Sequence, residues 1–87
     1  MRIEAGVAFL QGDLILDNAT RLLAECEAAL SEGVDTFDLA GVAKLDSSAI
    51  SLLLALRRRA AGKSLQFHHV PESLTSLTRL YGLDDQF

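Results

Sequence analysis

The segment from Ser47 to Ala61 constrains the fold of this chain more than any other part of the sequence. Its leucines and Ile50 fall on nearly every side of the predicted helix for about two turns. A helix without a polar face must be buried by other elements, so it should lie at the centre of a packed domain. Three consecutive arginines, beginning at Arg57, stand where cations suit the negative end of the helix dipole, and Gly62 ends the helix.

Two further helices are predicted on either side of this one. Asp17 or Asn18 can cap the first, because either side chain can accept a bond from an unpaired N–H, and Gly33 ends it. Pro71 fits the first position of the last helix, which Gly82 ends. Apolar residues recur at steps of three and four in both helices: Ala19, Leu22, Leu23, Cys26, Ala29 and Leu30 in the first, and Leu74, Leu77, Leu80 and Tyr81 in the last.

Four short segments have the alternation or the apolar run of a strand, at residues 2–5, 7–11, 36–39 and 65–69. A turn at Ala5-Gly6 joins the first two, and a loop at residues 40–45 leads to Asp46. Short βαβ units pair their strands in parallel through right-handed crossovers, and the opening turn adds one antiparallel strand. The sequence therefore predicts one α/β domain over residues 1–87, in the order β-β-α-β-α-β-α, with a mixed four-stranded sheet.

The phases of the strands divide the predicted sheet into two unlike faces. Apolar side chains can share one face: Ile3, Phe37, Leu39, Leu65 and Phe67. Polar side chains can share the other: Arg2, Glu4, Asp38, Gln66 and His68. Parallel sheets are usually covered on both faces, so an open face indicates either a very small domain or a surface that meets a partner. One hypothesis is therefore a structural or dimerising module without a regulated site.

Size, charge and cysteine content exclude several classes of protein. The 87 residues leave little room for a deep cofactor pocket beside a core. A net charge of −4 argues against nucleic-acid binding, and one cysteine cannot form an internal disulfide. The chain has no signal-peptide pattern and no apolar run near the roughly 20 residues that cross a bilayer. We expect a cytoplasmic protein without membrane insertion.

No strong catalytic or metal-binding signature is present. The sequence has no phosphate-binding glycine loop, no H-E-x-x-H and no C-x-x-C. His68 and His69 are neighbours on a predicted strand, so their side chains point to opposite faces and do not readily share a metal. Cys26 lies on an apolar stripe and is predicted to be a buried thiol. We therefore expect no enzymatic activity, no metal and no cofactor.

The start of the buried helix is the one segment whose residues indicate a specific role. Asp46 is predicted to cap it, and Ser47 and Ser48 then lie beside free backbone N–H groups at the positive end of the dipole. The structural interpretation is that these residue types simply suit a first turn. The functional one is that an exposed serine contacts a partner or accepts a phosphate, which would bring about −1.5 to −2 charges into the interface.

The basic segment at the other end of the same helix also has two interpretations. Arg57 to Lys63 holds four of the eight cations of the chain. It is either a solvated helix end or a patch that contacts an acidic partner. The predicted partner-binding residues are Lys44, Asp46, Ser47, Ser48 and Arg57.

The residues from Phe37 to Val42 and from Leu45 to Leu54 resemble the core signature of STAS domains, the anti-sigma-factor antagonists and the domains attached to sulfate transporters. Gly12-Asp13-Leu14 and Asp17-Asn18-Ala19 are similar to the second strand and first-helix entry of that family. The ending, with Leu80-Tyr81-Gly82-Leu83, most resembles the MlaB-like branch, stand-alone cytoplasmic subunits of the Mla phospholipid-transport ABC complex. The match covers nearly the whole chain and implies a single STAS-like domain.

The resemblance implies a role for each serine. In MlaB-like proteins the first hydroxyl after the aspartate, here Ser47, lies at the interface with the ABC ATPase. The implied partner is an MlaF-like ATPase, and indirectly its permease, in a complex that maintains outer-membrane lipid asymmetry. The chain would then be cytoplasmic and peripheral to the inner membrane.

The anti-sigma-factor antagonists imply a different role. In them the second hydroxyl, here Ser48, is phosphorylated by an anti-sigma factor kinase. Two departures weaken this alternative: Ala49 stands where the antagonists usually have glycine, and Ile15 stands where they often have an acidic residue. The predicted phosphorylation sites are Ser48 and, less directly, Ser47.

Overall fold

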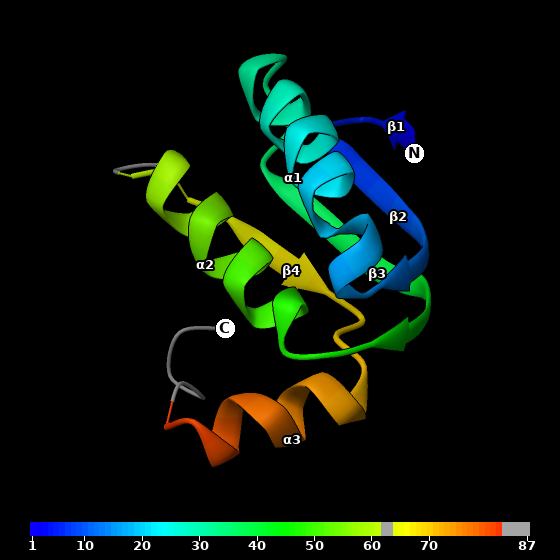
Figure 1. Cartoon of the computed structure of the whole chain (residues 1–87). Helices are drawn as coiled ribbons and strands as arrows, with labels where there is room; N and C mark the ends of the chain where they lie inside the picture. The colour runs from blue at the N-terminus through cyan, green and yellow to red at the C-terminus, as the bar shows by residue number, and fades with distance from the viewer. Residues whose placement is uncertain (62–63, 83–87) are drawn as a thin grey trace.

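The computed structural model describes residues 1–61 and 64–82 (Figure 1). Gly62, predicted to end the central helix, lies outside these residues, as do Lys63 and Leu83. The elements are β1 (Arg2–Glu4), β2 (Val7–Leu14), α1 (Leu16–Ser31), β3 (Thr36–Leu45), α2 (Ser48–Arg59), β4 (Gln66–His68) and α3 (Glu72–Leu80). The predicted α/β class and the order β-β-α-β-α-β-α are confirmed.

The four strands form one mixed sheet in the order β1-β2-β3-β4. β1 pairs antiparallel with β2, whereas β2 with β3 and β3 with β4 are parallel. The predicted turn between the first two strands is present, with Ala5 at φ 50° and Gly6 at φ 81°. Two successive left-handed residues are typical of a tight hairpin turn whose twist matches that of the strands.

The two faces of the sheet differ as predicted. Phe37 of β3 is opposite Ala8 of β2, and both are fully buried beneath α1 and α2, which lie side by side in Figure 1. On the other face the register places Phe9 opposite Asp38. The same row continues to Arg2 on one side and His68 on the other, and both are exposed. No helix described here covers this second face, although Asp38 itself is only 7% exposed.

The helix predicted to be central supplies much of the core. α2 buries five side chains: Ala49, Ile50, Leu52, Leu53 and Leu56. They pack with apolar residues of the sheet and with the stripe of α1, which includes Cys26. Cys26 is fully buried, and this burial raises the pKa of its thiol to about 12, so it is a core residue with no nucleophilic thiolate at neutral pH.

The loop predicted at residues 40–45 is wrong. β3 continues to Leu45, and β2 continues past the predicted end at Gln11 to Leu14. Gly41 suggested a turn, but here glycine allows the backbones of β2 and β3 to approach closely. A Cβ at this position would lie 2.7 Å from the carbonyl oxygen of Leu10. Two register shifts in the β2–β3 pairing disturb the alternation of side chains from which a strand is recognised.

The helix termini require three further corrections. α1 begins at Leu16, and neither Asp17 nor Asn18 caps it; the Asn18 side-chain amide donates to the Asp13 carbonyl instead. Pro71 occupies the position before α3 rather than its first position. The stripe of α3 holds for Leu74, which is fully buried, and for Leu77, which packs against the core. It fails for Leu80 and Tyr81, which are exposed.

We predict that Gly41→Ala destabilises the domain by about 1–3 kcal/mol, because the added methyl group would force the backbones of β2 and β3 apart. Chemical denaturation followed by circular dichroism measures this loss. The matched control is Ala43→Ser at a neighbouring exposed position, expected to change stability by less than about 0.5 kcal/mol. Equal stability of Gly41→Ala and the parent protein would contradict the steric explanation.

Candidate functional site

The predicted site lies where two helices begin at the same end of the sheet. β2 and β3 are parallel neighbours, and their last paired residues are Leu14 and Leu45. α1 follows β2 after one residue, and α2 follows β3 after two, so both helix N-termini are brought together (Figure 1). The backbone N–H of Asp46 donates to the Leu14 carbonyl at 3.1 Å, which fixes Asp46 between the two strands.

The carboxylate of Asp46 binds the start of both helices. Its Oδ1 accepts the backbone N–H of Ser48 at 2.8 Å and also the Ser48 hydroxyl. Its Oδ2 accepts the backbone N–H of Leu16 at 3.1 Å. α2 is assigned from Ser48, which makes Ser47 its N-cap, without a side-chain cap bond. Ser47 itself has the helical angles φ −63° and ψ −16°, so Asp46 stands just before the first helical turn and accepts an N–H of that turn, as a capping residue does. No side chain near the start of α1 caps that helix, and the bond from the Leu16 N–H to Asp46 takes the place of such a cap.

These bonds also decide the charge of Asp46. The side-chain and backbone bonds from Ser48, and then the bond from Leu16, hold the pKa of this carboxyl below its ordinary value of 3.8. The group is therefore ionised at neutral pH. The two helix N-termini beside it are each the positive end of a helix dipole, so they also favour the negatively charged form of Asp46.

The two serines occupy different environments. Ser47 is exposed and lines a hollow between α2 and the end of α3, together with Ile50, Ser51 and Tyr81. Ser48 is half-buried, with its hydroxyl engaged by Asp46, and lines a second hollow between α1 and α2. The other residues of this second hollow are Leu16, Ala19, Thr20, Leu23, Ser51 and Leu52.

The two hollows adjoin at Ser51, which lines both, and we call them together the helix-start surface. Its residues are Leu16, Ala19, Thr20, Leu23, Ser47, Ser48, Ile50, Ser51, Leu52 and Tyr81. Large apolar side chains stand exposed on either side of it: Leu16 is 75% exposed and Tyr81 is 58% exposed. Exposed apolar groups that gather around shallow hollows are typical of surfaces that bind other proteins.

Eight residues of this surface were not among the predicted site residues: Leu16, Ala19, Thr20, Leu23, Ile50, Ser51, Leu52 and Tyr81. Leu16 precedes the apolar stripe that was recognised in α1, and this displacement is the signal that could have marked it. Tyr81 was assigned to the buried stripe of α3. Ser51 is a polar residue on an otherwise apolar helix, which is itself a sign of a solvent-facing side.

The remaining predicted residues lie at different distances from this surface. Lys44 is exposed near the end of β3, two residues before Asp46, and its backbone N–H donates to Asp13 Oδ1 at 3.2 Å. Arg57 is ten residues beyond Ser47, about 15 Å along the axis of α2, and lines neither hollow of the helix-start surface.

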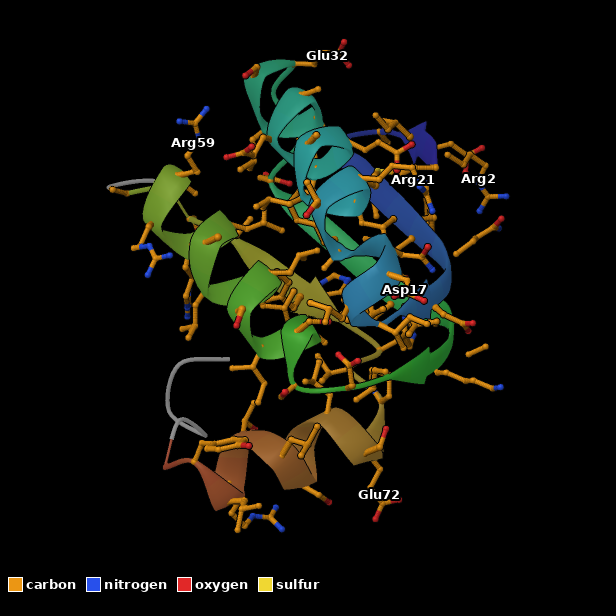
Figure 2. The ribbon with its side chains drawn as sticks, in the orientation of Figure 1. Arg2, Asp17, Arg21, Glu32, Arg59 and Glu72 are labelled. Atoms are coloured by element: carbon orange, nitrogen blue, oxygen red, sulfur yellow. The ribbon has the colours of Figure 1, made fainter. Side chains whose placement is uncertain are left out.

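The basic end of α2 is a separate region of the molecule. Figure 2 shows Arg59 at the end of α2 opposite to its start, while Asp17 lies in the first turn of α1. Arg59 forms an ion pair with Glu27 of α1 at 3.1 Å. The structure therefore brings Asp46, Ser47 and Ser48 together, leaves Lys44 beside them, and separates Arg57 from them.

The side chains of the helix-start surface are suited to contact with another molecule rather than to catalysis. It offers hydroxyls and apolar side chains, and it lies beside the Asp46 carboxylate, whose oxygens are occupied by helix N–H groups and the Ser48 hydroxyl. Within residues 1–61 and 64–82, no group of three or more His, Cys, Asp or Glu side chains could hold a metal ion. In the same part of the chain, no helix is long and apolar enough to cross a membrane.

Comparison with known proteins agrees with this architecture. The family model described as "Mlab, STAS domain" matches residues 3–87. The chain belongs to this STAS-domain family. Members of the family are in general not enzymes, and the family supports a regulatory or accessory role. A search among curated proteins gives no match.

We predict that Asp46→Asn lowers the Tm at pH 7, because the neutral amide is a weaker acceptor for the N–H groups of Leu16 and Ser48. The folded-state pKa of Asp46 is depressed, so its contribution to stability is complete above the unfolded value near 3.8. It is lost as the pH falls through the lower folded value. The Tm difference between Asp46→Asn and the parent should therefore shrink below about pH 4.

Thermal unfolding from pH 7 to pH 2 measures this difference. Asp17→Asn is the matched control, since Asp17 is an exposed residue in the first turn of α1 and does not cap either helix. A Tm difference for Asp46→Asn that stays constant across this range would contradict a role of the ionised carboxylate.

Proposed function

We propose that this chain is a non-enzymatic accessory subunit that binds the ATPase of an Mla-type ABC transporter. It would do so through the helix-start surface, with Ser47 near the centre of the contact. The transporter would move phospholipid and maintain outer-membrane lipid asymmetry. The chain would lie in the cytoplasm, peripheral to the inner membrane through its partner.

The observation that carries this proposal is the exposed apolar surface around Ser47. Leu16 of α1 and Tyr81 at the end of α3 flank it, and among the described residues the other large apolar side chains left exposed are Met1, Ile3 and Leu80. A partner that covers both side chains would remove this apolar area from water, which is the main favourable term in protein association. Membership of the Mlab STAS family gives the proposal its choice of partner.

The environment of Ser48 favours docking over a phosphorylation switch. Its hydroxyl donates to Asp46 Oδ1, and the residue is half-buried. A phosphate on this oxygen would stand against an ionised carboxylate and would compete for the cap of both helices. An anti-sigma-factor antagonist switched at Ser48 is therefore the second candidate, supported by the same motif but opposed by this contact.

We predict that Ser47→Arg weakens binding to a co-expressed MlaF-like ATPase at least about tenfold, because the long charged side chain would occupy the hollow between α2 and α3. Co-purification gives the first measure, and titration of the purified ATPase gives the affinity. Ser31→Arg is the matched control: it introduces the same side chain at an exposed serine at the end of α1, far from Ser47.

Three outcomes separate the two candidates. Loss of binding in Ser47→Arg, with binding retained in Ser31→Arg, supports the proposal. Equal binding by both variants means that this surface is the wrong one. A phosphopeptide that carries Ser48 in protein isolated from cells, without ATPase binding, would favour the antagonist function instead.

A further inference from the structure

β1 forms one edge of the sheet, and no strand among the described residues pairs with its outer side. Figure 1 shows β1 at the margin of the molecule, with no helix or strand beyond it. All three of its residues are exposed. An edge strand presents unpaired N–H and C=O groups to which a strand of another chain can bond. β1 is therefore a place where the sheet can be extended.

The turn that follows β1 decides which of its backbone groups face outward. Two residues of positive φ join β1 to β2, as in a type I′ turn, so Glu4 and Val7 flank the turn. Residues that flank such a turn form a hydrogen-bonded pair, and bonded and non-bonded pairs then alternate along the ladder. Ile3, opposite Ala8, belongs to a non-bonded pair, so its N–H and C=O point away from β2.

The sequence of β1 is complementary to itself in one register. When two copies of β1 pair antiparallel about Ile3, the outward N–H and C=O of each Ile3 meet those of the other copy. The same register sets Arg2 of one copy opposite Glu4 of the other, twice. Opposite charges directly across two strands stabilise the pair, whereas like charges destabilise it. A two-fold interface requires this property, because the same patch must fit itself.

The two charged side chains of β1 lie where this register needs them. Arg2 and Glu4 are exposed on the face of the sheet that no described helix covers, with Arg2 Nε 3.4 Å from Glu4 Oε2 of the same strand. The Arg2 guanidinium stacks 4.5 Å from the centre of the Phe9 ring, which keeps its charge on this face. In the paired strands the four charges alternate around a square. Such a network contributes more than an isolated surface ion pair.

The apolar residue of β1 adds a second reason for pairing. Ile3 points to the other face of the sheet, yet it is 45% exposed because it stands at the edge. Met1, which precedes the strand, is 42% exposed. Pairing about Ile3 brings the two isoleucine side chains together and removes apolar surface from water.

The opposite edge of the sheet lacks this complementarity. Antiparallel pairing of two copies of β4 about Phe67 would set Gln66 opposite His68. These two side chains already bond to each other within one strand, with His68 Nε2 3.0 Å from Gln66 Oε1. No carboxylate or arginine lies among the three residues of β4, so no ion pair would fix its register.

We propose that β1 is a dimerisation edge, through which two copies of this chain pair antiparallel about Ile3 into one continuous sheet. A strand of three residues buries little area, so the dimer is weak and forms at high protein concentration. The two-fold axis stands perpendicular to the sheet, which places the two helix-start surfaces at opposite ends of it. No residue of β1 belongs to that surface, so the dimer does not depend on the proposed function.

Sedimentation of the full chain from about 1 μM to about 1 mM tests the dimer, with an average mass that should rise toward twice that of the monomer. Arg2→Glu and Glu4→Arg each set like charges opposite one another at two places. Each variant alone should therefore dimerise at least about tenfold more weakly than the parent. An equal mixture of the two variants restores both opposite-charge pairs and should dimerise about as tightly as the parent.

Arg79→Glu is the matched control, since it makes the same change of charge at an exposed position near the end of α3 and should leave the dimer unchanged. A chain that carries both Arg2→Glu and Glu4→Arg should also dimerise like the parent, which separates loss of pairing from loss of the fold. A parent chain that stays monomeric at about 1 mM would overturn the proposal. So would single variants that dimerise like the parent, or a mixture and a double variant that both stay monomeric.

Discussion

The carboxylate of Asp46 is the group on which the structure around the two helix starts depends. Neighbouring parallel strands end at the same edge of a sheet, so α1 and α2 must both begin there. Each helix start leaves backbone N–H groups without a partner in the helix. One carboxylate between the strands accepts an N–H from each, at Leu16 and at Ser48. A single side chain thus fixes the relative position of two helices that follow different strands.

This arrangement explains why the surface beside Asp46 suits a partner. The first two turns of α2 are mostly buried, and the exposed positions at this end of the helix are Ser47, just before it, and Ser51. The exposed Leu16 and Tyr81 stand on the neighbouring helices. The result is a shallow apolar surface on a base of two packed helices, which would not have to be ordered before it bound a partner. The described residues, 1–61 and 64–82, carry no long inserted loop, so such a surface is formed by the helices and strands themselves.

The strongest predictions from the sequence were those that rest on long apolar patterns. The central helix, the stripe of α1 and the two faces of the sheet all follow from the spacing of apolar residues, and the structure confirms them. The capping role of Asp46 also followed, because a cap depends on residues close in sequence.

The errors come from contacts between distant residues. Gly41 suggested a loop because the close approach of the Leu10 carbonyl cannot be seen in the sequence. The start of α1 was misplaced because its cap comes from Asp46, thirty residues away. Tyr81 was assigned to the core because the apolar pattern of α3 continues as far as this residue. The burial of the helix stops earlier, so Leu80 and Tyr81 are exposed. Membership of the helix-start surface depends on such contacts, so only part of that surface was predicted.

Amide hydrogen exchange at Leu16 and Ser48 tests most directly whether one carboxylate holds both helix starts. The two amides belong to different helices but donate to the same side chain. In Asp46→Asn, both should lose protection together, while amides in the middle of α1 and α2 keep theirs. Loss of protection at Ser48 alone, with Leu16 unchanged, would show that Asp46 caps only its own helix and would contradict the account.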